Sequence, residues 1–242
     1  MRAMILAAGR GERMRPLTDS IPKPLLQVGG RRLIEWHLQG LARAGFREVI
    51  INLAWLGSQI PAALGNGERY GLSLHYSDEG ATALETGGGI FQALPWLGAA
   101  PFLVINGDVW CDFDYGRLHT PQALDADADA RLVLVPNPPQ HPRGDFALDR
   151  RQTAQGSDRH TAQYDVADRE AAQRYTFCGI AVYRAEFFAG CIPGRFPLLP
   201  LLRRAAAARR LRGDLHEGLW FDIGTPERLA QLDARLANGA LG

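Results

Sequence analysis

Lysine is almost missing from this sequence of 242 residues, because Lys23 is the only lysine among 27 lysine and arginine residues. The other 26 are arginine, so position 23 departs from a strong preference for arginine. An ammonium group is compact and flexible, whereas a guanidinium group is planar, so the two are not interchangeable at a site with strict geometry. The single lysine, set between Pro22 and Pro24, therefore indicates a site that requires an ammonium group.

Cysteine and long apolar runs are also scarce. The three cysteines, Cys111, Cys178 and Cys191, form no C-x-x-C pair, which favours a reducing compartment and argues against a disulfide framework or a structural zinc site. The apolar run at residues 4–8 is too short for a signal peptide, and no run is long enough to span a membrane. These absences predict a cytoplasmic protein.

The sequence also has no large excess of positive or negative charge. The formal net charge is +1, with 46% hydrophobic and 22% charged residues. This balance gives no electrostatic reason to expect a nucleic acid or a membrane as partner. A chain of this length can bury the core of one large domain without disulfides.

Short apolar runs alternate with amphipathic ones in the first half of the chain. The pattern predicts strands at 2–6, 49–52, 72–76 and 102–105, and helices at 33–44, 57–64 and 91–94, the last stopped by Pro95. Strands separated by helices imply crossover connections. The sequence therefore predicts a single α/β domain, Rossmann-like, whose mixed and mainly parallel central sheet is flanked by helices.

The second half of the chain is less regular. We expect 124–130 to be a solvated surface stretch and 149–174 to be an exposed or partly disordered polar excursion. Regular structure is predicted again as strands at 175–183 and 220–223 and helices at 198–210 and 226–237. The last helix has Thr225 as its N-cap and Asn238-Gly239 as its stop.

A glycine loop follows the first predicted strand. Gly9 and Gly11 allow main-chain N–H groups to approach a phosphate chain, and Arg13 and Lys23 add two cations. The spacing is neither G-x-G-x-x-G nor a Walker loop. We therefore predict a triphosphate site, with a tight strand-to-helix turn as the alternative. A residue before proline favours extended backbone, which we expect at Lys23.

Two aspartates are candidates for binding Mg²⁺. Asp108 follows the predicted strand at 102–105, at the sheet edge where open α/β folds bind ligands. Mg²⁺ bound to nucleotide phosphates takes one or two protein carboxylates, and Asp222 is the expected second one. Asp112 and Asp114 are alternatives to Asp108. The alternative role for Asp222 is to cap the turn before the last predicted helix.

The glycine triplet 87–89 also requires an explanation, since three glycines cost backbone entropy. It predicts either a tight turn or a flat ligand, such as a nucleobase, against the chain just before a helix that begins at Ile90.

The sequence as a whole resembles the sugar-1-phosphate nucleotidylyltransferases. The resemblance is carried by ILAAGRGERMRPLT at 5–18, IPKPLLQVGGRRLIEWHL at 21–38, INLAWLGSQI at 51–60, LETGGGIFQALPWLG at 84–98, NGDVWCD at 106–112, RGDFAL at 143–148, TFCGIAVY at 176–183 and WFDIGTPERL at 220–229. It covers nearly the whole chain except 149–174.

The resemblance implies a role for each matching residue. Ala8, Gly9, Gly11 and Glu12 would wrap the triphosphate, Arg13 and Lys23 would be the catalytic cations, Asp108 and Asp222 would hold Mg²⁺, Gly87 and Gly88 would read the base, and Asn106 and Asp145 would face the sugar. Residues 1–120 would form the nucleotide-binding half and 121–242 the sugar-binding half. Many relatives have a second lysine for the sugar phosphate. This chain has none, which leaves Arg143 and Arg174 as candidates.

The implied partners are UTP and a sugar 1-phosphate, in a monomer or small homo-oligomer. The resemblance is strongest to the branch that transfers UMP to N-acetylmuramic acid 1-phosphate, with release of pyrophosphate, in cell-wall sugar recycling. Transfer of GMP to mannose 1-phosphate, or of TMP or UMP to glucose 1-phosphate, is the enzymatic alternative. A nucleotide-sugar sensor without turnover is the non-enzymatic one.

Overall fold

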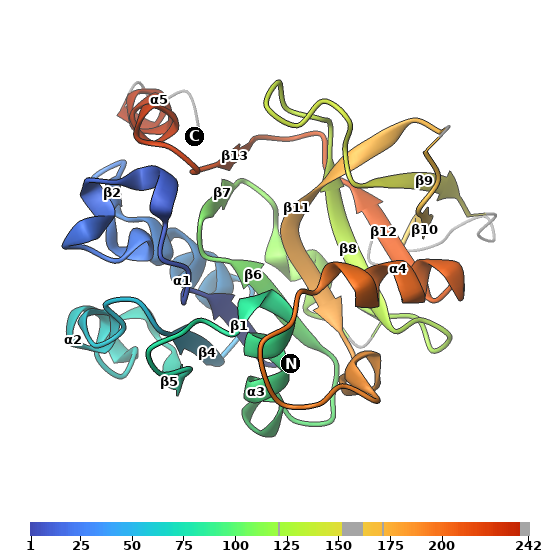
Figure 1. The fold of residues 1–242 in the computed structure, drawn as a ribbon, viewed down its shortest axis with the longest axis horizontal. Coiled ribbons are helices and arrows are strands. Elements are labelled where there is room, and N and C mark those ends of the chain that lie inside the picture. Colours follow the sequence, from blue (N-terminus) through green and yellow to red (C-terminus); the bar gives the residue numbers. More distant parts are fainter. Residues whose placement is uncertain (121, 152–161, 171, 238–242) are drawn as a thin grey trace.

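A computed structural model describes residues 1–120, 122–151, 162–170 and 172–237. Within these residues, nine strands form one sheet in the order β5-β4-β1-β6-β11-β8-β12-β10-β9 (Figure 1). The strands of this sheet are β1 (Ala3–Leu6), β4 (Glu48–Leu53), β5 (Ser73–Asp78), β6 (Phe102–Asn106), β8 (Ala130–Val135), β9 (Phe146–Arg150), β10 (Tyr164–Ala167), β11 (Arg174–Tyr183) and β12 (Leu211–Leu215). Two ribbons pair β2 (Gln27–Val28) with β3 (Arg31–Arg32) and β7 (Val109–Cys111) with β13 (Trp220–Asp222).

The sheet is parallel in its first half and mixed in its second. Strands β5, β4, β1 and β6 are parallel neighbours, whereas β11 is antiparallel to both β6 and β8. Parallel neighbours need crossover connections. The helices α1 (Leu33–Arg43), α2 (Gln59–Leu64) and α3 (Glu85–Leu97) lie in these crossovers, and α4 (Leu199–Ala207) and α5 (Pro226–Ala237) follow later in the chain. The predicted α/β domain with a mixed central sheet is confirmed.

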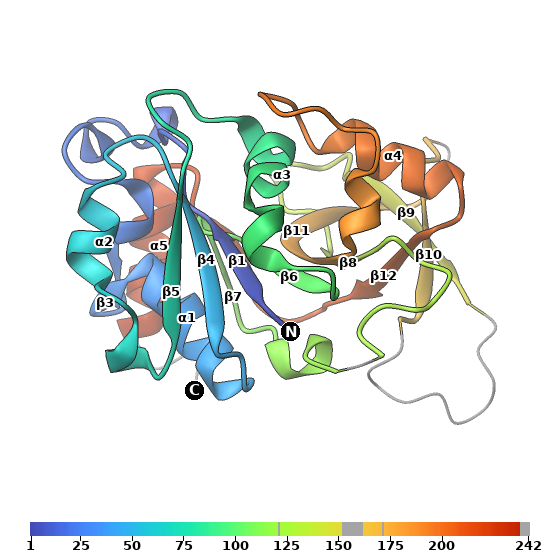
Figure 2. The same cartoon turned by 90° about the horizontal axis from the view of Figure 1, so that it is seen from below.

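Helices bury both faces of the sheet, which explains the continuous apolar runs of its strands. On β1, Ile5 belongs to the core shared with Leu38 of α1, whereas Met4 belongs to the core shared with Ile90 of α3 and Leu202 of α4. Successive side chains of a strand point to opposite faces, so a strand buried on both faces needs apolar residues at every position. Figure 2 shows α3 and α4 on the same side of the sheet.

The prediction for α3 was wrong at both ends. The helix begins at Glu85 and therefore contains the glycine triplet, and it continues through Pro95 to Leu97. Pro95 lies in the last turn, where the missing N–H removes one hydrogen bond, and Gly98 closes the helix by donating to the Leu94 carbonyl at 3.0 Å. Glycines hide the periodicity of a helix because they carry no side chain.

Two segments that were predicted to be solvated are built into the fold instead. Leu124 and Ala128 are buried within 124–130. Within 149–174, β10 is a sheet strand between β12 and β9. The acidic residues of both segments pair with a buried arginine, Arg212, whose nitrogens lie 3.2 Å from Asp125, 2.7 Å from Asp127 and 3.2 Å from Asp165. Residues 152–161 and 171, in the predicted excursion, and the predicted stop at 238–239 lie outside the described residues.

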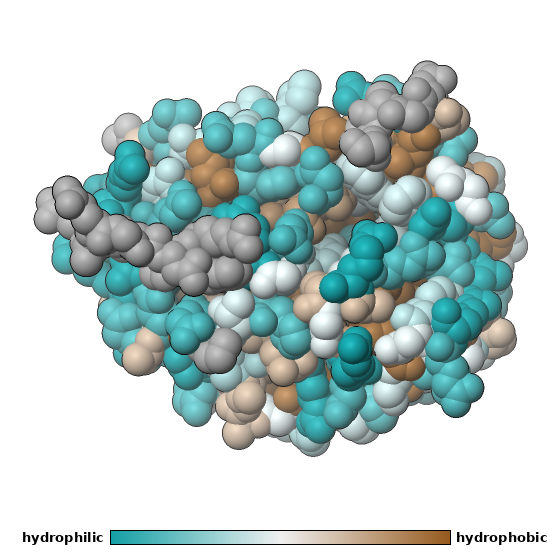
Figure 3. All heavy atoms as spheres, turned by 180° about the vertical axis from the view of Figure 1, so that it is seen from behind, coloured by the Kyte–Doolittle hydropathy of each residue, from teal (hydrophilic) through white to brown (hydrophobic). Residues whose placement is uncertain are grey.

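Hydrophilic side chains are interspersed with small hydrophobic groups on the face turned away from the viewer in Figure 1 (Figure 3). Among the described residues, none of the helices has the length and apolar character needed to cross a membrane.

Candidate active site

The candidate site lies at the carboxyl ends of β1 and β6, which are parallel neighbours. Gly107, just after β6, donates its N–H to the Leu6 carbonyl oxygen at 2.9 Å. A Cβ at Gly107 would lie 2.6 Å from that oxygen, so only glycine allows the two strand ends to approach this closely. The contact joins the glycine loop after β1 to the loop that carries Asp108.

A cleft of about 380 Å³ opens at these strand ends. Its volume lies within the ~300–1,000 Å³ typical of small-molecule sites. Among the residues predicted for the site, its lining includes Ala8, Gly9, Gly11, Glu12, Arg13, Lys23, Asn106 and Asp108.

Gly11 sets the course of the glycine loop. Its φ of 68° is in the left-handed region, and it begins the 3-10 turn Glu12–Met14. Thr18 holds this point by donating its hydroxyl to the Gly11 carbonyl oxygen at 2.9 Å. The loop is thus the tight turn that the sequence offered as an alternative, and it also lines the cleft as the triphosphate hypothesis requires.

Lys23 lies beneath this loop and is 7% exposed. Its Nζ donates to Oδ2 of Asp108 at 2.8 Å. The expected extended backbone is wrong, since Lys23 begins a 3-10 helix, Lys23–Leu25. Pro24 is compatible with this turn because the first residues of a helix have N–H groups without a partner in the helix. Burial and the ion pair hold the ammonium group at the floor of the cleft.

Asp108 and Asp222 are brought together by the β7–β13 ribbon. Asp222 is the register partner of Val109, and Ile223 donates its N–H to the Asp108 carbonyl at 3.0 Å. The carboxylate of Asp222 pairs with the guanidinium of Arg228. Both aspartates line a second cleft, adjoining the first, that contains Arg13, Arg228 and Trp220 among other residues. Asp108 therefore lines both clefts, as do Arg13 and Asn106.

The chemistry of this pair suits Mg²⁺. Carboxylate oxygens are the ligands that Mg²⁺ prefers, and one or two of them suffice when phosphates and waters complete the shell. Both side chains are partly exposed, at 42% for Asp108 and 25% for Asp222. An ion there would compete with the two cations that the carboxylates now contact.

The alternative aspartates have other partners. Asp114 caps a 3-10 turn by accepting the Gly116 N–H at 2.8 Å, and Asp112 contacts His216 at 2.7 Å. Neither lines the two clefts that meet at Asp108. Of the aspartates in this loop, Asp108 is the one placed at the site.

Asn106 lines both clefts, whereas Asp145 lines neither. The Asp145 carboxylate accepts the Phe177 N–H at 2.8 Å and contacts Nε2 of His141 at 3.1 Å. His141 itself lines the second cleft. Asp145 thus orients a histidine that the sequence analysis missed. In the sequence, this histidine could have been noticed only from its position four residues before Asp145.

Gly87 and Gly88 lie beneath the segment 194–196 and not among the residues that line the cleft. A Cβ at Gly87 would lie 2.6 Å from the Phe196 ring, and one at Gly88 would lie 2.3 Å from the Gly194 oxygen. The Gly88 N–H donates to the Phe196 carbonyl at 3.1 Å. The structure therefore gives both glycines a packing role at the start of α3, next to Glu85 and Thr86, which do line the cleft.

A buried polar network that sequence reasoning missed supports the glycine loop. Asn52, 3% exposed, accepts the Ala7 N–H at 2.7 Å and donates to Glu79 at 2.6 Å. Glu79 also accepts the Leu84 N–H at 2.6 Å. The network ties the start of the loop to the segment before α3. An asparagine inside an apolar strand was the available signal, since buried polar groups require partners.

Comparisons with known proteins agree with this geometry. Residues 2–239 match the nucleotidyl transferase family. The chain is 49% identical over 236 residues to N-acetylmuramate alpha-1-phosphate uridylyltransferase of Neisseria meningitidis, covering 97% of each chain. It is 36% identical to the protein of the same name from Caulobacter vibrioides, covering 97% of this chain and 96% of the other.

Solved structures share the fold at low sequence identity. A Bacillus anthracis protein in complex with a sucrose has a TM-score of 0.79 at 21% identity, covering 98% of this chain and 95% of the other. HddC from Yersinia pseudotuberculosis complexed with GMP-PN has a TM-score of 0.71 at 19% identity, covering 97% of this chain and 98% of the other. The family match and the two curated relatives, taken with the arrangement of the site, show that this chain belongs to the nucleotidyl transferase family.

Proposed function

We propose that this enzyme transfers UMP from UTP to N-acetylmuramic acid 1-phosphate, giving UDP-N-acetylmuramic acid and pyrophosphate. The observation that carries the choice of substrates is the 49% identity, over 97% of both chains, to a uridylyltransferase named for that sugar phosphate. The reaction class is supported by the cleft in which Lys23, Arg13 and Asp108 meet the glycine loop.

The triphosphate of UTP binds along the loop formed by Ala8, Gly9, Gly11 and Glu12, with its base toward the start of α3 near Gly87 and Gly88. Exposed main-chain N–H groups in a glycine loop form a concave site for anions. Arg13 and Lys23 supply the two cations. We assign nucleotide binding to the half formed by residues 1–120 and sugar binding to the half formed by residues 121–242, with Asn106 contributed to the sugar site from the first half.

In the reaction, an oxygen of the sugar phosphate attacks the α-phosphorus of UTP. A new P–O bond forms as the bond from the α-phosphorus to the bridging oxygen breaks, and pyrophosphate leaves with its electron pair. Phosphoryl chemistry of this kind is accelerated mainly by positioning and charge stabilisation. Lys23 and Arg13 stabilise the negative charge that develops on the α-phosphate and the leaving group.

Asp108 and Asp222 would hold Mg²⁺, which supplies charge neutralisation to the phosphates when bound. The two aspartates come from opposite halves of the chain and meet through the β7–β13 ribbon. The carboxylate pair therefore depends on the pairing of β7 with β13.

The sugar 1-phosphate binds in the second cleft, with Asn106 on its inner side and His141, held by Asp145, on its outer side. We assign the role of the missing second lysine to Arg228, because its guanidinium lines this cleft together with that of Arg13. Arg143 and Arg174, the candidates named from the sequence, are less suitable, since neither lines this cleft.

We place this reaction in the cytoplasm, in the recycling of cell-wall sugars, with the protein acting as a monomer or small homo-oligomer. The sugar phosphate named for the two curated relatives supports the link to cell-wall sugars.

A panel of substrates tests the proposal. Pyrophosphate release is measured with UTP, dTTP, GTP and ATP against the 1-phosphates of N-acetylmuramic acid, glucose, N-acetylglucosamine and mannose. We expect the highest kcat/KM for UTP with the muramic acid phosphate. Higher values for GTP with mannose 1-phosphate, or for dTTP or UTP with glucose 1-phosphate, would reassign the substrates. No release across the panel would make the protein a sensor.

Two glycine substitutions separate ligand binding from packing. A Cβ at Gly9 would have no atom within 4 Å, so we expect Gly9→Ala to leave the melting temperature unchanged. The KM for UTP should increase, because the added methyl group would occupy the space where the phosphates bind. Gly88→Ala forces a 2.3 Å contact, so we expect the free energy of unfolding to fall by about 1–3 kcal/mol. Thermal unfolding and UTP kinetics on both variants check this. A Gly9→Ala variant with the wild-type KM would contradict the phosphate-binding loop.

A further inference from the structure

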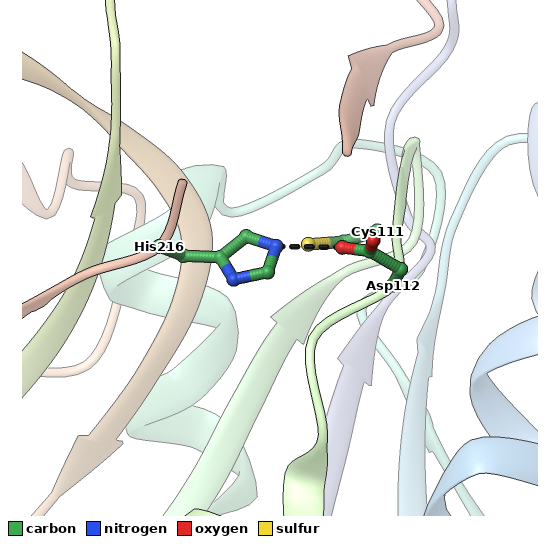
Figure 4. Close-up of side chains that lie close together, drawn as sticks. All are labelled: Cys111, Asp112 and His216. Carbon is green, nitrogen blue, oxygen red and sulfur yellow. Dashed lines mark hydrogen bonds and ion pairs between the residues drawn. The ribbon is translucent and has the colours of Figure 1, made fainter. Parts of the chain in front are cut away.

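Three side chains with different ligand atoms converge outside the two clefts. Cys111 ends β7, Asp112 follows it, and His216 follows β12 (Figure 4). One ligand atom from each lies within 4.8 Å of the other two, and Nε2 of His216 is 2.7 Å from Oδ1 of Asp112. In the described part of the chain, this is the group of three or more such residues that could hold a metal ion.

We propose that Cys111, Asp112 and His216 bind one divalent transition-metal ion of the zinc type. A thiolate and an imidazole favour Zn²⁺ and its neighbours over Mg²⁺, which prefers oxygen ligands alone. Three protein ligands leave a fourth tetrahedral position for water. The site is therefore chemically distinct from the Asp108–Asp222 pair.

The backbone around the cluster is shaped to these side chains. A Cβ at Gly218 would lie 2.5 Å from Cε1 of His216 and 2.6 Å from Oδ1 of Asp112, so only glycine lets the loop 216–219 close over both ligands. Leu219 donates its N–H to the same Asp112 oxygen at 2.9 Å. The Phe113 ring contacts the imidazole edge to face at 5.4 Å between centroids. The His216 side chain is only 12% exposed.

Binding has a simple proton balance. Burial raises the pKa of the Cys111 thiol to about 12, so the sulfur carries a proton at neutral pH when no ion is present. Metal coordination releases this proton to solvent, and the His216–Asp112 hydrogen bond gives way to two bonds to the ion. No oxidant or other reactant is needed.

The position of the cluster gives the ion a structural consequence. Cys111 is the register partner of Trp220 in the β7–β13 ribbon, the ribbon that brings Asp108 and Asp222 together. His216 lies in the segment that leads into β13. An ion bound here would fasten the start of β13 to the end of β7, and so stabilise the closed ribbon.

Cobalt binding to the full chain tests the site directly, with Co²⁺ as the probe. We expect one Co²⁺ per chain, with the near-ultraviolet charge-transfer absorption of a cobalt–thiolate bond, and displacement by Zn²⁺ but not by Mg²⁺. In Cys111→Ser the absorption should disappear, and in His216→Ala the affinity should fall by at least about 100-fold, beyond the 10–100-fold typical of outer-shell changes. Cys191→Ser is the matched control and should behave as wild type, since Cys191 is a partly exposed cysteine outside the cluster.

Thermal unfolding of the wild-type chain gives a second readout that needs no variant. Zn²⁺ at 100 times its Kd should raise the melting temperature by about 5–10 °C for a domain of this size. Absence of the thiolate absorption, its retention in Cys111→Ser, or a melting temperature that Zn²⁺ leaves unchanged would overturn the proposal. The His216–Asp112 contact would then be a hydrogen bond of the loop and nothing more.

Discussion

Lys23→Arg is expected to lower kcat by about 10²–10³-fold, the loss typical when one pre-positioned charge-stabilising group is removed. The substitution keeps the charge but changes its shape. Lys23 is 7% exposed and lies directly beneath the glycine loop. Its Nζ is held 2.8 Å from Oδ2 of Asp108, so the site is shaped around a compact ammonium group. A planar guanidinium cannot take the position of the ammonium group there.

The measurement is steady-state turnover with saturating UTP and sugar phosphate, together with thermal unfolding to confirm that the variant folds. Arg15→Lys is the matched control, because Arg15 belongs to the same loop but is 54% exposed and pairs with Asp19 at the surface. We expect wild-type turnover from this control. A Lys23→Arg enzyme within threefold of the wild-type rate would remove the ammonium group from the mechanism.

Asp108→Asn is expected to cause a loss of turnover of at least about 10²-fold, as the removal of a stabilising group at the reacting phosphates does. The amide has the shape of the carboxylate but no charge, so it binds Mg²⁺ weakly and leaves Lys23, whose Nζ lies 2.8 Å from Asp108, without its ion-pair partner. A higher Mg²⁺ concentration should restore part of the activity. The measurement is a Mg²⁺ titration of the initial rate at fixed UTP.

Asp114→Asn is the control for this experiment, since Asp114 lies six residues later, beyond β7, and caps a 3-10 turn outside both clefts. Its Mg²⁺ titration should match that of the wild type. If Asp108→Asn also titrated like the wild type, the assignment of the metal carboxylates would be wrong.

Much of the first half of the fold could be predicted from local pattern. The apolar runs that became β1, β4 and β6 are buried on both faces, and the helix α1 has a clear apolar stripe that ends near Gly45. Such signals depend on a few neighbouring residues. The glycine loop could be read in the same way, because the sequence from Gly9 to Arg13 carries its own turn chemistry.

The elements that were predicted wrongly depend on contacts between residues that are distant in the sequence. The beginning of α3 at Glu85 is set by the segment 194–196, which packs on Gly87 and Gly88. The strand β10 inside the polar excursion is held by pairing with β9 and β12, and no local apolar pattern marks it. A polar segment that pairs its charges with Arg212 cannot be told from a solvated one by composition.

The two aspartates illustrate the same limit within the site. Each was selected from its own motif, yet their proximity depends on the register of β7 and β13, in which Asp222 faces Val109. Arg228, which pairs with Asp222, and the His141–Asp145 pair became visible only in the structure. The cluster of Cys111, Asp112 and His216 was hidden for the same reason, because His216 is distant in sequence and the cysteine pattern argued against zinc.

A crystal structure of the chain with UTP and Mg²⁺ tests the central claim most directly. We expect the triphosphate along residues 8–13, with Nζ of Lys23 within hydrogen-bond distance of a phosphate oxygen and the ion bound by Asp108 and Asp222. A triphosphate bound elsewhere, or one that leaves Lys23 paired with Asp108 and far from any phosphate, would contradict it.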